Sequence, residues 1–302
     1  MKRLAVWLAL FAAAATTFAG PVVRAAIRDS AQASPPARAP QRIVSLVPAA
    51  TEMVFAMGAG SRLVGVGSYD RFPPEVEKIA KVGGLLDPNI EAILALRPDL
   101  AIVYDTQDEL TQRLARGGVP IFRYSHRDLA DITSTMRELG VRVGSKPAAD
   151  AAAGAIEQQL QAVRARVAGL PRPKALLIFG RDPGTLRNIT ASAGYGFLHY
   201  LLELAGGTDV LGDLKRQSVD LSTEMVLARA PEVIVELHYG SSLRREGLAA
   251  ERLVWNALAS VPAVRNNRVY LLTGDEFVLP GPRIVLAADR FARALHLEAY
   301  QR

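Results

Sequence analysis

The sequence predicts an α/β protein of two lobes, each with a central, mostly parallel sheet flanked by helices, joined by one long backbone helix. Apolar strands alternate with helical stretches along the chain, an order that builds parallel sheets covered by helices. Two stretches that begin 133 residues apart, Glu91–Val103 and Glu224–Val235, have nearly the same sequence pattern. A helical stretch without an internal proline separates them. These observations divide the chain into two similar halves.

The repeated stretch reads as a short helix, a tight turn and a buried strand. In each copy a glutamate, Glu91 or Glu224, begins an amphipathic segment, Pro-Asp or Pro-Glu interrupts it, and aliphatic residues follow. Asp87 precedes the first helix, and Asp220 and Ser222 precede the second, as candidate helix caps. The helix dipole favours a negative charge in the first turn. Each half therefore presents one carboxylate at an equivalent place.

The first half begins with a β-branched strand that leads into a helix starting near Ala49 and ending before Gly58. Strands and helices then alternate to the end of this half. The expected first lobe is 42–146, with strands at 42–48, 63–66, 100–104 and 120–124 and further helices at 91–96 and 109–116.

The predicted connecting helix, 147–170, is rich in Ala, Gln, Arg and Glu, with apolar residues at helical spacing. At a rise of 1.5 Å per residue it would be roughly 35 Å long, enough to run along both lobes, although an ordinary crossover helix has the same pattern. After it, the second lobe, 171–302, is expected to mirror the first. Its expected strands are 174–179, 233–237 and 268–272, and its helices are 197–205, 224–229, 253–258 and 283–295.

The first 25 residues have the pattern of a secretory signal peptide: a basic start at Lys2 and Arg3, an uncharged apolar run, and small residues up to Ala25. A retained membrane anchor is the alternative, but the apolar run is shorter than the ~20 residues that a spanning helix needs. Residues 26–41, rich in Ala, Pro, Ser and Gln, are expected to be a flexible leader.

The composition fits a periplasmic protein that is soluble after cleavage of its signal peptide. No cysteine is present, so the chain has neither a disulfide nor a cysteine that could carry a lipid anchor. Loss of residues 1–25 would lower the formal charge from +6 to +3, which does not favour a nucleic-acid partner. The pair Arg244 and Arg245, with Arg252, is expected to lie on a solvated helix face.

The sequence resembles the substrate-binding proteins of ABC importers for vitamin B12, iron-siderophore and haem, most of all the vitamin B12 type. The resemblance covers Arg42 to Leu297. It depends on the opening motif Arg42–Glu52 and the segment Val64–Glu75, on the two repeated stretches, and on Gly274–Phe277 followed by Pro282–Ala288.

The resemblance implies a partner and a docking contact. In that family a glutamate on each lobe docks onto arginines of the permease, and by position these residues are Glu91 and Glu224. A monomeric two-lobed receptor that docks on a permease dimer needs one charged contact per lobe, and such rim charges act chiefly on orientation and association rate. The alternative is that both residues are only helix N-terminal charges worth a few tenths of a kcal/mol.

A ligand of such a receptor lies between the lobes, against the loops at the strand ends. Aromatic rings supply flat apolar contact with a corrin, a porphyrin or an aryl chelate, and an arginine could pair with carboxylate or catecholate oxygens. The candidate ligand-binding residues are Tyr69, Tyr104, Arg181, His238, Tyr239, Asp275 and Phe277.

The expected ligand is a bulky metal chelate, with cobalamin or another corrinoid favoured and an iron-siderophore or haem as alternatives. At positions where the vitamin B12 type tends to place tryptophans, this chain has Gly84 or Leu85, Tyr104, Ser218 and Glu276, and Trp255 is expected to pack in a helix. Haem would need an axial His or Tyr. His126 and His238 follow strands and could face the cleft, whereas His199 and His296 lie within predicted helices. Because the four histidines are scattered, neither a directly bound metal ion nor a cofactor is expected.

An exported enzyme is the alternative of another class. The chain has no G-x-S-x-G, H-E-x-x-H or P-loop sequence. Gly58–Gly65 looks like a dinucleotide motif, but it leads from a helix into a strand, the reverse of the required order. Asp182 and Asp213 have no partner at a spacing that suggests proton transfer. The prediction is therefore a binding protein, not an enzyme.

Overall fold

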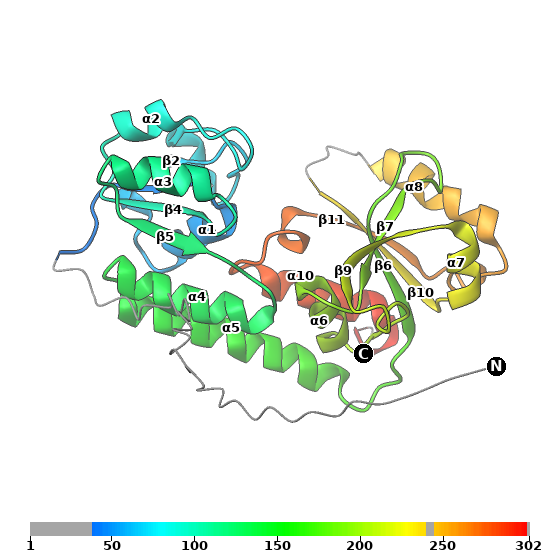
Figure 1. Cartoon of the computed structure of the whole chain (residues 1–302). Helices are drawn as coiled ribbons and strands as arrows, with labels where there is room; N and C mark the ends of the chain where they lie inside the picture. Colours follow the sequence, from blue (N-terminus) through cyan, green and yellow to red (C-terminus); the bar gives the residue numbers. More distant parts are fainter. Residues whose placement is uncertain (1–37, 240–244, 301–302) are drawn as a thin grey trace, which may run out of the picture. The chain divides into compact units, whose positions relative to one another are not determined.

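Two β-sheets form the framework of the protein in the computed structural model, which describes residues 38–239 and 245–300. The signal peptide, most of the leader and Arg244 lie outside the described residues. The described residues belong to one compact unit, Ala33–Arg302. Figure 1 shows the elements in order along the chain.

The first sheet has the strand order β3-β2-β1-β4-β5, and all of its ladders are parallel. In the central register Val44 lies opposite Gly65 on one side and Ala101 on the other. The connections between these strands include helices, as the alternating pattern predicted. The strands are β1 (Ile43–Ser45), β2 (Leu63–Val66), β3 (Ala80–Lys81), β4 (Leu100–Tyr104) and β5 (Ile121–Tyr124), and the helices are α1 (Pro48–Ala56), α2 (Ile90–Ala95), α3 (Asp108–Arg116) and α4 (Leu129–Arg142).

Both faces of this sheet are buried. Successive side chains of a strand point to opposite faces, so a single strand contributes to two core clusters. In β4, Leu100 and Ile102 pack in the core cluster that includes residues of α1 and α4. Ala101 and Val103 pack in the cluster that includes residues of α2 and α3. The continuous apolar run of β4 is thus explained by burial on two sides.

The second sheet has the order β11-β10-β6-β7-β9, with β8 paired to β6. Its strands are β6 (Lys174–Gly180), β7 (Ile189–Ala193), β8 (Thr208–Asp209), β9 (Arg216–Leu221), β10 (Val233–His238) and β11 (Val269–Thr273), and its helices are α6 (Phe197–Leu204), α7 (Thr223–Arg229), α8 (Arg245–Leu253), α9 (Pro262–Arg265) and α10 (Ile284–Leu295). Short 3-10 helices occur at Gly60–Arg62, Pro74–Lys78, Val254–Leu258, Asp275–Phe277 and Leu297–Tyr300.

The second half mirrors the first only in part, which corrects the sequence-based expectation. The ladders of β6 with β10 and β8, and of β10 with β11, are parallel, whereas β7 is antiparallel to both β6 and β9. The predicted helix at 253–258 is the end of α8 followed by a 3-10 helix. The strands β7 and β9 are rich in Ala, Ser, Gln and Arg, so they lack the aliphatic run that marks the buried parallel strands.

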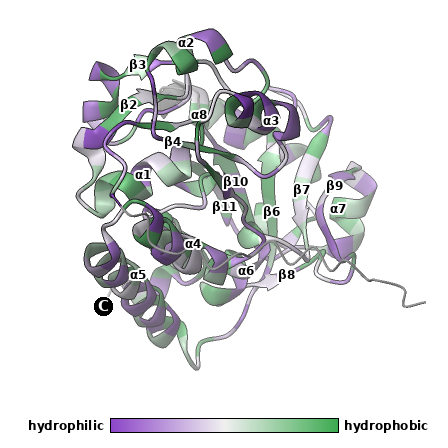
Figure 2. Ribbon diagram, turned by 60° about the vertical axis from the view of Figure 1, so that its left-hand side comes forward, coloured by the Kyte–Doolittle hydropathy of each residue, from purple (hydrophilic) through white to green (hydrophobic). Residues whose placement is uncertain are grey.

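The predicted connecting helix is α5 (Lys146–Val167), which runs beside α4 (Figure 1). Its ribbon alternates between hydrophilic and hydrophobic colours in Figure 2. The buried side of α5 includes Ala153, Ile156 and Leu160, which belong to one core cluster together with residues of both sheets. The two-lobed α/β class predicted from the sequence is therefore confirmed, with α5 packed against elements of both halves.

Candidate ligand-binding site

The candidate site is built from the loops at the carboxyl ends of the parallel strands. In the first sheet, the direction in which strands are added reverses between β1 and β4, and ligands of open α/β sheets bind at such a switch point. The loops after β2, β4 and β5 reach this edge from the first half. The loops after β6, β10 and β11 form the corresponding edge of the second sheet. These loops carry most of the ligand-binding residues predicted from the sequence.

A row of aromatic rings connects the two halves. Tyr104, at the end of β4, packs edge-on against Tyr124 with ring centroids 6.0 Å apart. The ring of Tyr124 lies 5.7 Å from that of His126, which in turn lies 5.8 Å from Phe197 at the start of α6. The hydroxyl of Tyr124 donates a hydrogen bond to the carbonyl oxygen of Pro280, at 2.9 Å. The row therefore passes from the first half to the second.

A pocket of about 320 Å³ lies at the second-half end of this row. Residues from both halves line it, and apolar or aromatic side chains predominate, as in small-molecule sites generally. It is lined by His126, Arg127, Phe179, Tyr195, Gly196, Phe197, Leu198, Gln217, Ser218 and Val278.

Sequence reasoning did not single out most of these pocket residues. Phe179 precedes the predicted Arg181, and Ser218 was noted only as a position without tryptophan. Tyr195, Phe197 and Gln217 depend on the antiparallel strands β7 and β9, which the sequence pattern did not predict. The available signal was the glycine on each side of Tyr195, because Gly194 and Gly196 both have positive φ and mark a sharp turn at the end of β7.

The three predicted tyrosines all have side chains that are at least partly exposed. Tyr69, in the loop after β2, is 68% exposed, and Tyr239, after β10, is 46% exposed. Tyr104 is partly buried, and burial raises its pKa to about 12, so its hydroxyl is a hydrogen-bond donor at neutral pH. Asp275 begins the 3-10 helix after β11 and is partly exposed.

Arg181 lies instead in a buried charge network of the second half. Its side chain is 3% exposed, with Nε 2.9 Å from Glu236 and Nη1 2.8 Å from Glu251. Glu236 also accepts a hydrogen bond from Trp255 Nε1 at 2.8 Å and lies 2.9 Å from His238 Nε2. Although burial alone would raise the pKa of Glu236, His238, Trp255 and Arg181 together lower it. Arg181 therefore neutralises internal carboxylates.

Phe277 is likewise an internal side chain. It is fully buried and stacks on Phe291 with ring centroids 5.5 Å apart, while the guanidinium of Arg290 lies over its ring. Trp255 is fully buried, as the sequence predicted. The structure assigns Arg181 and Phe277 to internal packing, and the proposed ligand contacts are confined to Tyr69, Tyr104, His238, Tyr239 and Asp275.

Within residues 38–239 and 245–300, no group of three or more His, Asp or Glu side chains is placed to hold a metal ion. His199 is buried in α6 and lies 2.8 Å from Asp209, and His296 is buried beside the end of α10. His126 lines the pocket, and burial lowers its pKa, so the ring is neutral at neutral pH and can accept a proton or a metal. Of these three histidines, His126 is therefore the one placed to reach a chelate.

Asp70 is a buried carboxyl group at the ligand edge of the first sheet. It is 1% exposed and follows Tyr69 directly. Burial raises its pKa to about 6, against the opposing influence of the Thr51 hydroxyl and the Lys81 charge. The native state therefore holds a proton that the unfolded chain releases at lower pH.

We expect Asp70→Asn to stabilise the protein at neutral pH. Between about pH 4 and 6 the native state binds more protons than the unfolded state, so stability falls as the pH rises and stays lower above pH 6. A shift of about two pKa units corresponds to roughly 3 kcal/mol. Chemical denaturation at about pH 7.5 should show this gain, which should vanish near pH 4. Asp213→Asn is the control: Arg229 lowers the pKa of Asp213, so that variant should not gain stability.

The two candidate docking glutamates occupy equivalent positions in the structure. Asn89 Oδ1 accepts a hydrogen bond from Ala92 N at the start of α2, and Ser222 Oγ accepts one from Met225 N at the start of α7. Ser222 was a predicted cap, whereas Asn89, not Asp87, caps the first helix. In both helices the glutamate is the second residue after the cap.

Both helices also expose a leucine three residues after the glutamate. Glu91 and Glu224 are exposed, and Leu94 and Leu227 are 37% and 42% exposed. Residues three apart on a helix lie on the same face. Each half thus presents the same pair, a carboxylate with an apolar neighbour.

Two α/β halves around a shared, aromatic ligand edge are the organisation of a protein that binds a small molecule between them. The chain matches the periplasmic binding protein family over residues 43–276, and it belongs to that family. The family is one of binding proteins. The residues that the structure describes include no helix with the length and apolarity needed to cross a membrane.

The chain is similar over most of its length to curated vitamin B12-binding proteins. The chain is 30% identical to the vitamin B12-binding protein of Yersinia pestis (strain Pestoides F) over 86% of its length and 88% of that protein. It is 31% identical to the vitamin B12-binding protein of Salmonella typhimurium (strain LT2), covering 84% of this chain and 90% of that one.

Among solved structures, the periplasmic vitamin B12 binding protein BtuF of Vibrio cholerae is similar with a TM-score of 0.73 and 27% identity, covering 87% of this chain and 99% of that one. A periplasmic haem-binding protein from Pseudomonas aeruginosa is similar with a TM-score of 0.72 and 26% identity, covering 85% and 93%.

Proposed function

We propose that this protein is the periplasmic receptor of an ABC importer, which captures a bulky metal chelate, with a corrinoid favoured, between its two halves and delivers it to a permease dimer. The observation that carries the proposal is the aromatic row and pocket shared by the two halves. A flat macrocycle offers large apolar faces, for which Tyr69, Tyr104 and Tyr239 are suitable contacts. The vitamin B12-binding relatives support the corrinoid.

The charge of the ligand edge also favours a corrinoid. Arg181 is neutralised by Glu236 and Glu251, and Arg283, beside the 3-10 helix Asp275–Phe277, pairs with Glu52. These two arginines are therefore not available to an anionic siderophore or to the carboxylates of haem, and Arg127, which lines the pocket, pairs with Asp131. A ligand with an uncharged, amide-bearing periphery has no such need.

Haem is the second candidate, favoured by one specific feature. His126 lines the pocket with a neutral ring, which is the form that can bind iron axially. The haem-binding relatives share the fold and a quarter of the sequence. Hemin is thus the natural competitor to cobalamin in a binding test.

The function is tested by titrating the mature protein with cyanocobalamin, hemin, and ferric siderophores of the catecholate and hydroxamate types. A ligand that binds only the folded state stabilises it by about 2.7 kcal/mol at a free concentration one hundred times its Kd. Trp255, hydrogen-bonded to Glu236 beside His238, would be the only tryptophan after cleavage and serves as a second reporter. A saturable shift of the Tm with cyanocobalamin is expected, and binding to none of these chelates would contradict the proposal.

We expect Tyr69→Ala and Tyr239→Ala each to weaken cyanocobalamin binding roughly tenfold, because each removes an aromatic contact worth about 1 kcal/mol beyond its buried area. Isothermal titration measures the Kd directly. Since both side chains are exposed, the Tm of the ligand-free protein should not change. Leu286→Ala, an exposed apolar change on α10, is the matched control and should bind as the wild type does.

The same proposal places the protein in the periplasm as a soluble monomer after signal-peptide cleavage, with Glu91 and Glu224 docking on the two permease subunits. Leu94 and Leu227 would add an apolar contact beside each carboxylate. The equal spacing of cap, glutamate and leucine in α2 and α7 supports a partner that presents two equivalent surfaces. A homodimeric permease has that symmetry.

A further inference from the structure

Three charged residues from three sequence motifs, none of them a proposed ligand or docking contact, meet at one point in the structure. Glu52 ends the opening motif, Glu276 lies in the segment Gly274–Phe277, and Arg283 lies in the segment Pro282–Ala288. Arg283 Nη2 donates to Glu52 Oε1 at 2.6 Å, and Arg283 Nε lies 3.0 and 3.1 Å from the two carboxylate oxygens. The pairing is thus two-pronged and joins α1 of the first half to the start of α10 in the second.

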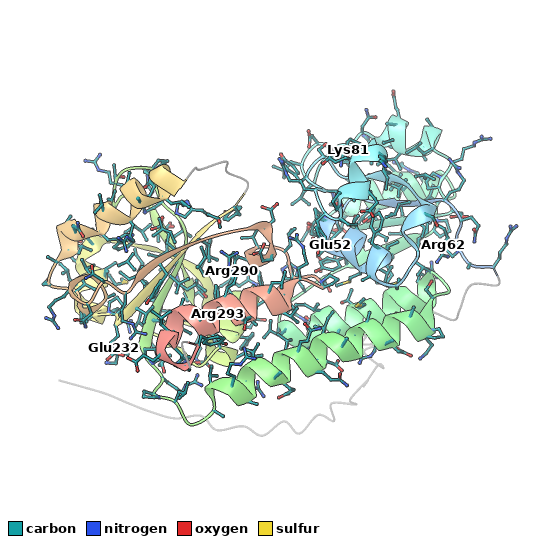
Figure 3. All side chains as sticks on the ribbon, turned by 180° about the vertical axis from the view of Figure 1, so that it is seen from behind. Glu52, Arg62, Lys81, Glu232, Arg290 and Arg293 are labelled. Atoms are coloured by element: carbon teal, nitrogen blue, oxygen red, sulfur yellow. The ribbon has the colours of Figure 1, made fainter. Side chains whose placement is uncertain are left out.

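The ion pair continues into a chain of charges. Arg283 Nη1 lies 3.7 Å from Glu276, which accepts a hydrogen bond from Arg290 Nη1 at 2.6 Å. Glu52 and Arg290, labelled in Figure 3, are the two ends of this chain. The side chain of Glu52 is 3% exposed and that of Arg283 is 18% exposed. Because buried charges need their partners, Glu52 of the first half depends on Arg283 of the second half for neutralisation.

Arg283 also holds the loop that carries Tyr69. Its guanidinium lies over the ring of Phe72, 4.4 Å from the centroid. Phe72 and Tyr69 belong to the same loop after β2. Three residues before Arg283, the carbonyl of Pro280 accepts the hydrogen bond from Tyr124. A single segment of the second half, 280–283, therefore fixes a helix, a loop and an aromatic ring of the first.

We propose that Arg283 is a positioning residue that ties α1 and the Tyr69–Phe72 loop to the second half and so sets the spacing of the two ligand edges. It does not touch the ligand. The planar guanidinium fixes both distance and orientation, which the point charge of a lysine would not do. A receptor whose edges are held at the bound spacing loses less freedom on binding and retains its ligand longer.

The spacing can be measured directly, because the chain contains no cysteine. Glu109→Cys on α3 and Arg252→Cys on α8 are exposed positions, one in each half, for a pair of spin labels. In the ligand-free protein, pulsed electron–electron double resonance should give a narrow distribution of distances between the two labels. Arg283→Gln and Arg283→Lys should both broaden it and should speed dissociation of cyanocobalamin about tenfold.

Arg137→Gln is the matched control. Arg137 forms the same two-pronged pairing with Glu157, but between α4 and α5, so its loss should change neither the distances nor the dissociation rate. Glu52→Gln should also broaden the distribution, and the double variant should broaden it no further than Arg283→Gln alone, because Arg283→Gln already removes the pairing with Glu52. If Arg283→Gln does not fold, Arg283→Lys and Phe72→Leu carry the test.

A distribution as narrow in Arg283→Lys and Glu52→Gln as in the wild type would overturn the inference. The distances are measured without ligand, so the result stands apart from the identity of the chelate. If no chelate binds any variant, the proposed function fails while the positioning role is still decided.

Discussion

Replacement of Arg181 by alanine is expected to lower the free energy of unfolding by about 3–5 kcal/mol, because it leaves Glu236 and Glu251 buried without their positive partner. For a chain of this size that corresponds to a fall in Tm of about 10 °C. Differential scanning calorimetry measures the Tm, and urea denaturation measures the free energy. This is among the largest effects that a single substitution outside the apolar core can have here.

The effects of Arg181→Ala on stability and on ligand affinity distinguish an internal structural role of Arg181 from a direct ligand contact. In the internal role, the triple variant Arg181→Met, Glu236→Gln, Glu251→Gln should recover much of the lost stability, since removal of all the charges is far less costly than removal of one. The folded Arg181→Ala protein should bind cyanocobalamin with a Kd within a few-fold of the wild type. An unchanged Tm with a large loss of affinity would show instead that the guanidinium faces the ligand.

Charge reversal at the two docking positions, Glu91→Lys with Glu224→Lys, is expected to reduce uptake by roughly a hundredfold while the Kd for the ligand stays unchanged. Like charges placed together at an interface cost several kcal/mol, and each 1.4 kcal/mol is a factor of ten. Both side chains are exposed, so the fold should not be affected. Transport of labelled ligand into vesicles that contain the permease measures the effect.

Glu138→Lys with Glu203→Lys makes the same change of charge at exposed positions on α4 and α6, one in each half, and should leave transport intact. Leu94→Ser with Leu227→Ser tests the apolar neighbours and should weaken docking less than the charge reversal. Normal uptake by the charge-reversed protein would refute the docking role, whatever ligand the receptor carries.

Much of the fold could be predicted because its signals are local. The aliphatic runs of β4 and β10 are long enough to read as strands, and β4 is buried on both faces. The repeated Glu-to-Pro segments identified α2 and α7 together with the strands that follow them. By contrast, β7 and β9 have no continuous aliphatic run that would mark them as strands. The sequence pattern also did not distinguish α4 from the loop before α5. Their stability comes from pairing and packing rather than from an aliphatic run of their own: β7 pairs with β6 and β9, and α4 packs against α5.

The site was less predictable, because the direction of each side chain depends on partners that are far away in the sequence. A position after a strand end places a residue near the ligand edge, but it does not show where the side chain points. Arg181 and Phe277 follow strands as Tyr69 does, yet they turn inward because Glu236, Glu251 and Phe291 lie behind them. Glu236 and Glu251 could not be paired with Arg181 from the sequence, since 55 and 70 residues separate them from it.

The strands β7 and β9 occur in one half only, whereas the capped glutamate helices occur in both. Under the proposed function, the surface that would dock on the transporter thus repeats itself, whereas the surface that would hold the ligand does not. A receptor built in this way could dock on a two-fold symmetric transporter in either of two orientations related by a 180° rotation. Its two glutamate helices would make equivalent contacts in both orientations. The ligand, bound between two halves that differ in structure, would still bind in one orientation relative to the receptor.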